Sequence, residues 1–145
     1  MARNRRRCLL TGLLVAASLG AVAADYSVRD YAIPAPLTAT PGDPVRGAAV
    51  VVDRRRGNCL SCHAVPLDAE FFGTTGPSLA AVGARLDAGQ LRLRVVDPKV
   101  INPMTMMPAY YKTDGLYRVA PEYVGRPILS AQEIEDVVAY LVTLD

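Results

Sequence analysis

Two cysteines and the only histidine of this chain lie within five consecutive positions. Cys59 and Cys62 are three positions apart, and His63 follows directly. This spacing is the attachment pattern of c-type haem. About one helical turn separates the thiols, so both sulfurs can form thioethers with the two vinyl groups of one porphyrin. His63 then lies under the iron as an axial ligand, and we predict one covalently bound haem c.

Three other uses of this cysteine pair compete with haem. A structural zinc site needs four ligands, whereas the chain beyond residue 24 offers two cysteines and one histidine. A thioredoxin-like dithiol belongs in a βαβ surrounding, which this sequence does not indicate. A disulfide between Cys59 and Cys62 would enclose little chain and stabilise little. The motif, an export signal and the lack of a rival ligand set favour haem.

The second axial ligand is predicted in a methionine-rich loop. Met104, Met106 and Met107 lie within four positions. With one histidine, and with both cysteines in thioethers, the other choices are tyrosine, lysine, water or an open position. Pro108 holds the residue before it extended, which favours Met107 as the ligand and Met106 as the second choice. His/Met ligation closes both axial positions and raises the potential, which suits electron transfer rather than oxygen activation.

The amino terminus has the pattern of a secretory signal peptide over residues 1–24. Four arginines precede a mostly apolar stretch at 9–20, and small residues follow at cleavage spacing. The stretch is shorter than the roughly 20 residues that span a bilayer, so cleavage is favoured over a membrane anchor. Cleavage after Ala24 would leave the cysteines in an oxidising compartment, which we expect to be the periplasm.

The charge of the remaining chain argues against nucleic-acid binding. The whole chain carries 16 basic and 14 acidic residues, a formal net charge of +2. Removal of the signal takes away four arginines and no acid, which leaves −2. The only basic run that remains is 54–56. We therefore expect no nucleic-acid partner.

An extended arm and a single cytochrome domain are expected after the signal. Four prolines between positions 33 and 44 disfavour helix and central strand, so residues 25–42 are predicted to be a proline-rich extended arm. Residues 43–145 have the length of one ordinary domain. No segment alternates polar with apolar residues over a useful length, so the predicted class is all-α with long loops.

The first helix is predicted from Pro44 to about residue 56. Asp43 can accept a bond from an unpaired N–H, and proline suits the first helical position. The helical spacing indicates one buried stripe of mostly small side chains that would permit close approach of another helix. That stripe comprises Val45, Ala48, Ala49 and Val52. The arginines at 54–56 would lie at the carboxyl end of this helix, where they complement the helix dipole and face solvent.

Two capping boxes predict the starts of two further helices. Ser130 and Glu133 form one, and an apolar face then runs nearly to the carboxyl terminus. Asp87 and Gln90 form a second, which opens a short helix that must end before Pro98.

From the haem motif onward the chain resembles the single-haem class I cytochromes c. That resemblance implies an all-α fold of helices and long loops wrapped around one covalent haem. In this family a proline near the position of Pro77, in the GPSL segment at 76–79, offers its carbonyl to the distal N–H of the haem histidine. The resemblance therefore implies that Pro77 orients His63 and tunes its basicity.

Several segments together resemble the SoxX family, the small monohaem subunits of the SoxAX cytochromes of bacterial sulfur oxidation. The resemblance runs from about Asp43 to Leu144. The features that narrow the resemblance from c-type cytochromes in general to the SoxX family are the tyrosines after Met107 and the segment at 127–141. The matching segments are RGNCLSCHA at 56–64, GPSL at 76–79, NP at 102–103, MPAYY at 107–111, KTDGL at 112–116, PIL at 127–129 and AYL at 139–141.

This resemblance implies a role in an L-cysteine S-thiosulfotransferase. Such complexes oxidatively join thiosulfate to a cysteine of the carrier protein SoxYZ, and the sulfur chemistry takes place on a SoxA-like dihaem or monohaem cytochrome subunit. A protein similar to SoxX would accept the electrons and pass them to a downstream soluble cytochrome c. The alternatives are a generic periplasmic class I cytochrome c, a subunit of another oxidoreductase, and a haem sensor, which would need an exchangeable coordination site.

Overall fold

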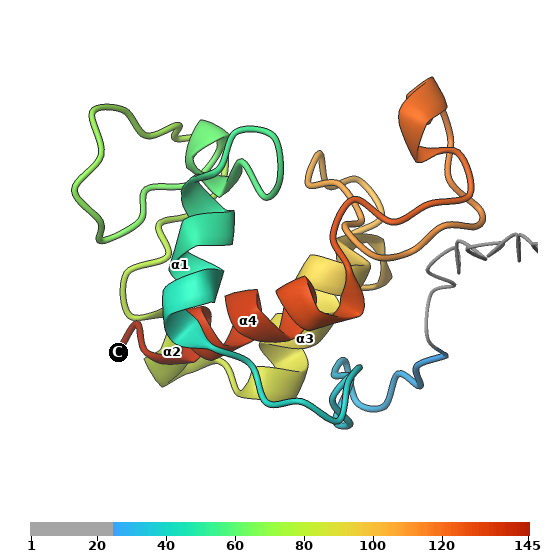
Figure 1. Ribbon diagram of the computed structural model, residues 1–145, viewed down its shortest axis with the longest axis horizontal. Coiled ribbons are helices and arrows are strands. Elements are labelled where there is room, and N and C mark those ends of the chain that lie inside the picture. The colour runs from blue at the N-terminus through green and yellow to red at the C-terminus, as the bar shows by residue number, and fades with distance from the viewer. Residues whose placement is uncertain (1–24) are drawn as a thin grey trace, which may run out of the picture.

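The computed structural model describes residues 25–145, so the predicted signal peptide lies outside the described residues. Within these residues, four α-helices and three short 3-10 helices are joined by long loops (Figure 1). Within the described part of the chain, the only β pairing is an isolated bridge between Arg29 and Ala32. The predicted all-α class is confirmed. In chain order the helices are α1 (Pro44–Val52), η1 (Cys59–Ser61), α2 (Val82–Arg85), α3 (Ala88–Val96), η2 (Pro98–Val100), η3 (Pro121–Tyr123) and α4 (Ala131–Val142).

The first and last α-helices pack directly on each other, and glycines permit the close approach. A Cβ atom on Gly47 would lie 2.9 Å from the Cβ of Tyr140, and one on Gly42, two residues before α1, would lie 2.9 Å from the Cβ of Ala139. Glycine alone leaves the room for this contact, because any side chain would meet the backbone of α4. The expected close helix approach is therefore present.

The face of α1 that makes this contact differs from the predicted one. Val45 is 79% exposed and Val52 is 40% exposed, whereas Gly47 and Val51 are buried. The prediction followed side-chain hydrophobicity and gave no weight to glycine. The buried face instead follows the position where two backbones can come closest.

Helix α1 also ends earlier than predicted, at Val52. Asp53 has extended dihedral angles, and its side chain accepts a bond from the N–H of Arg55 at 2.8 Å. This aspartate turn competes with continuation of the helix. The expectation of three solvated arginines holds only in part, because Arg56 forms an ion pair with Glu133 of α4.

The two predicted capping boxes are confirmed at the start of α3 and α4. The Asp87 carboxylate accepts from Gln90 N at 2.9 Å, and the Ser130 hydroxyl accepts from Glu133 N at 3.3 Å. Helix α3 ends before Pro98, as expected. The predicted apolar face of α4 is buried and comprises Ile134, Val137, Val138 and Leu141, and Leu144, two residues beyond the helix end, is buried as well.

The segment at 25–42 packs along the helices. Ile33 is 1% exposed, and its carbonyl accepts from Arg92 Nη1 at 2.7 Å. Arg92 also donates to both carboxylate oxygens of Glu135, at 2.7 and 2.8 Å, and Glu135 accepts from Leu37 N at 2.9 Å. A bidentate pair whose remaining groups are satisfied is stable when buried. It fastens this segment to α3 and α4.

Candidate haem site

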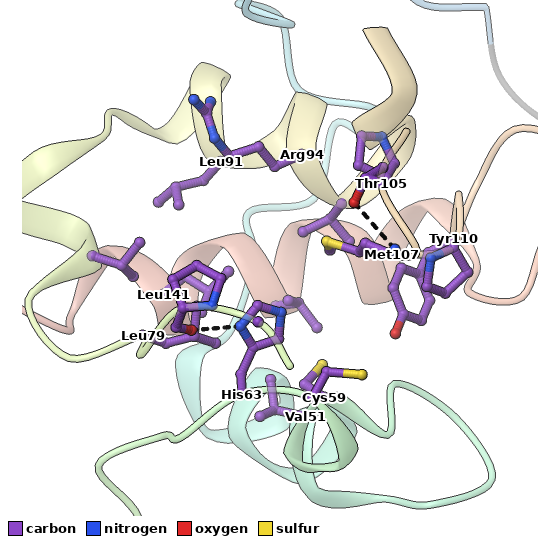
Figure 2. Close-up of a pocket in the computed structure, with 18 of the residues that line it drawn as sticks. Val51, Cys59, His63, Leu79, Leu91, Arg94, Thr105, Met107, Tyr110 and Leu141 are labelled. Carbon is purple, nitrogen blue, oxygen red and sulfur yellow. Dashed lines mark hydrogen bonds between the residues drawn. The ribbon is translucent and has the colours of Figure 1, made fainter. Parts of the chain in front are cut away.

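A cavity of about 710 Å³ lies between the helices, and mostly apolar side chains line it (Figure 2). This volume is within the usual range for cofactor sites. Every residue predicted for the site lines this one cavity. Those residues are Cys59, Cys62, His63, Pro77, Met106 and Met107.

A single helical turn arranges the two cysteines and the histidine. The N–H groups of Cys62 and His63 both donate to the carbonyl of Cys59, at 3.1 and 2.9 Å. No disulfide joins the sulfurs of Cys59 and Cys62. Burial raises the pKa of the Cys59 thiol to about 11. A redox dithiol needs a lowered thiol pKa, so this environment does not suit thioredoxin-like chemistry.

His63 is held firmly in one orientation. Its Nδ1 lies 2.6 Å from the carbonyl oxygen of Pro77, which is the contact expected from the resemblance. A donating Nδ1–H leaves the lone pair of the neutral ring on Nε2, the nitrogen suited to bind iron. The ring also lies against Gly76, where a Cβ atom would approach Nδ1 to 2.7 Å and Nε2 to 2.8 Å. The haem role of His63 and Pro77 stays a prediction.

The three methionines of the loop differ sharply in exposure. Met104 is 88% exposed and Met106 is 81% exposed, whereas Met107 is half-buried and packs against the core. Figure 2 shows the sulfur of Met107 directed into the cavity. The ring of His63 enters the same cavity from the side that carries Cys59. Met106 also reaches the cavity lining. These exposures favour Met107 over Met106 as the iron ligand.

Two arginines in the lining were not predicted from the sequence. Arg85 and Arg94 are cationic residues in the lining of this mostly apolar cavity, and Arg94 donates from Nη1 to the carbonyl of Gln90 at 2.9 Å. Such groups suit the two propionate carboxylates of a haem. The sequence did hold a signal for Arg94, because it lies three positions after Leu91 on the same face of the expected helix.

Tyr110 is a third unpredicted site residue. Its ring lines the cavity and is 8% exposed, and its hydroxyl donates to the carbonyl of Gly57 at 2.7 Å. Burial raises its pKa above the ordinary value, so the phenol stays protonated.

Together, these features fit a haem. The cavity joins two thiols, an oriented imidazole and a thioether in one mostly apolar space, and its cations suit the cofactor's carboxylates.

No helix in residues 25–145 has both the length and the apolar character to cross a bilayer.

Comparisons with known proteins support this assignment. The family model described as cytochrome c matches residues 44–145. A chain in the crystal structure of SoxXA from P. pantotrophus is similar, with 41% sequence identity and a TM-score of 0.76. The match covers 82% of this chain and 93% of that one. A search of curated proteins gave no match.

The predicted resemblance to SoxX and the class I fold are therefore confirmed. A family match over 102 residues at 44–145 brings with it the covalently bound haem c that defines the family. The chain belongs to the cytochrome c family, as an electron-transfer cytochrome of the SoxX type.

Proposed function

We propose that this chain is the electron-accepting haem subunit of a periplasmic SoxAX-like L-cysteine S-thiosulfotransferase. The observation that carries the proposal is the convergence of Cys59, Cys62, His63 and Met107 on one cavity, in a chain 41% identical to one in SoxXA. Both described cysteines would be used to hold one haem c. The sulfur chemistry therefore belongs to a SoxA-like partner.

The residues of this chain have separable tasks in that role. Cys59 and Cys62 would hold the cofactor as thioethers, and His63 would bind iron while Pro77 fixes its tautomer. Met107 would hold the iron through its thioether and so exclude water and other ligands. When bound, haem supplies a one-electron ferric–ferrous couple whose potential the His/Met pair raises.

The overall reaction defines what this subunit has to accept. Joining one thiosulfate dianion to the thiol of a SoxYZ-like carrier forms a sulfur–sulfur bond and releases one proton and two electrons. The one-electron couple of a haem c would let this subunit accept these electrons one at a time. The two electrons would therefore leave singly through this subunit to a downstream soluble cytochrome c.

Native co-purification tests the proposal. The full chain with a tag after Asp145 is expressed in its own host, and periplasmic and cytoplasmic fractions are purified separately. We expect a periplasmic complex in which haem staining reveals a second haem polypeptide. The variant in which Cys59 and Cys62 are both alanine controls for stain that is not covalent.

Other outcomes distinguish the alternatives. A monomeric haem protein without a haem-bearing partner would contradict the SoxAX-like role and favour a generic class I carrier. Ready binding of carbon monoxide to the ferrous protein would indicate an exchangeable axial site, as in a haem sensor, and would contradict ligation by Met107.

A further inference from the structure

Among the described residues, the loop that carries Met107 forms hydrogen bonds only with residues close to it in sequence. Thr105 donates its N–H to Asn102 at 3.0 Å, and Met107 donates its N–H to the hydroxyl of Thr105 at 3.2 Å. Lys99 donates to the carbonyl of Thr105 at 2.8 Å. These bonds shape the loop without fixing its distance from the segment that carries the cysteines and His63.

Tyr110 provides a connection between the two segments. Its backbone is anchored on the Met107 side, because its N–H donates to Val95 at 3.1 Å and its carbonyl accepts from Leu129 at 3.0 Å. Its side chain reaches the other segment, where the buried hydroxyl donates to Gly57 at 2.7 Å. Met107 lies three residues before this anchor.

The acceptor of this bond is itself fixed. Gly57 donates its N–H to Val50 of α1 at 3.2 Å, and a Cβ atom at this position would lie 2.6 Å from the Val50 carbonyl oxygen. Cys59 follows two residues later. The Tyr110 hydroxyl therefore ties the methionine loop to a rigid point beside the haem attachment site.

We propose that Tyr110 is a positioning residue that keeps the Met107 thioether in place against competing ligands. The proposal rests on the proposed ligation by Met107. Without the hydrogen bond, the loop would open more often and leave the iron accessible. One neutral hydrogen bond contributes on the order of 1 kcal/mol, so an external ligand should bind about fivefold more tightly when the bond is lost.

Imidazole titration of the ferric holoprotein measures this effect. Tyr110→Phe removes the hydroxyl and keeps the ring, and we expect about a fivefold lower dissociation constant for imidazole. The sulfur-to-iron charge-transfer absorption should also be lost at a lower temperature than the helical circular dichroism. This second measurement separates ligand release from unfolding in a destabilised variant.

Two other tyrosines supply matched controls. Tyr140 is 6% exposed, and among the described residues its buried hydroxyl has no hydrogen-bond partner. Tyr117 is 90% exposed. Tyr140→Phe and Tyr117→Phe should leave the imidazole affinity within twofold of the wild type.

The outcomes separate this proposal from the one on which it rests. Unchanged imidazole affinity in Tyr110→Phe, or an equal change in all three variants, overturns the positioning role alone. Absence of the sulfur-to-iron absorption from the wild type overturns methionine ligation itself, and the positioning role with it. The partner in the complex is tested separately by co-purification.

Discussion

The two walls of the cavity are built in different ways. The wall that carries His63 is tied by backbone bonds, with Gly73 N donating to Leu60 at 2.7 Å and Gly76 N donating to Cys62 at 2.8 Å. The wall that carries Met107 is a loop whose neighbouring methionine, Met106, is 81% exposed. Backbone hydrogen bonds fix the shape of the His63 wall, whereas the position of the Met107 wall depends on a few contacts. This contrast predicts that substitutions on the first disturb assembly and those on the second disturb ligation.

Loss of the attachment thiols should have the largest effect. With Cys59→Ala and Cys62→Ala together, we expect no covalent haem and no stably folded domain, because the cavity would lose the apolar group that fills it. Haem staining after denaturing electrophoresis and far-ultraviolet circular dichroism measure the two effects. A normally folded chain without haem would contradict the view that haem is part of the core.

Gly76→Ala tests how firmly the His63 wall is shaped. The new Cβ would meet the imidazole ring and push it away from Pro77, at a cost of about 1–3 kcal/mol in the free energy of unfolding. We expect a lower yield of holoprotein and a lower denaturation midpoint in guanidinium. Thr74→Ala changes an exposed neighbour and should do neither. Equal behaviour of the two variants would show that this wall is more adaptable than the contacts indicate.

Met107→Ala tests the other wall and should leave the fold in place. The iron would lose its thioether, so the reduction potential should fall by on the order of 0.1 V and carbon monoxide should bind the ferrous form. Met106→Ala is the matched control and should change little. Spectroelectrochemical titration decides between them, and the reverse result would transfer the ligand to Met106.

The smallest expected effect lies outside both walls, at the contact between α1 and α4. The Arg46 guanidinium hydrogen-bonds the buried Asp136 carboxylate and lowers its pKa from 3.8 to about 2. A lowered acid pKa stabilises the fold above pH about 4, and this stabilisation is lost as the pH falls through 2.

Arg46→Gln should therefore lower the free energy of unfolding modestly at pH 7, because the Arg46 side chain is 54% exposed and solvent partly screens its charge. In urea denaturation the difference from the wild type should shrink below pH 4. Arg54→Gln is an exposed control, and neither change should alter the haem spectrum. A constant difference down to pH 2 would assign the effect to packing.

Local signals made much of the fold predictable. The boxes at Ser130 and Asp87 depend on residues three positions apart, and α3 and α4 begin there as expected. Pro77 was implied by the family resemblance, whereas the all-α class followed from the lack of alternating segments. The other site residues followed from one short motif and a methionine cluster. Such features are local in sequence, so one chain suffices to find them.

The missed features depend on long-range contacts. The buried face of α1 is determined by the close contact between Gly47 and Tyr140. No residue near position 47 in the sequence indicates this contact. Arg92 and Glu135 look like solvent-facing charges in sequence, but they pair in the interior at 2.7 Å. Tyr110 likewise acquires its role only when folding brings Gly57 beside it.

The packing of α1 on α4 has a consequence for the order of folding. These helices begin at Pro44 and Ala131, so most of the domain separates them along the chain. Closing so long a loop is slow compared with forming a local turn. Until the last helix has been made and has docked, the segment at 59–63 would stay open to the machinery that attaches haem. The contact between α1 and α4 therefore has to wait until the last helix has been made.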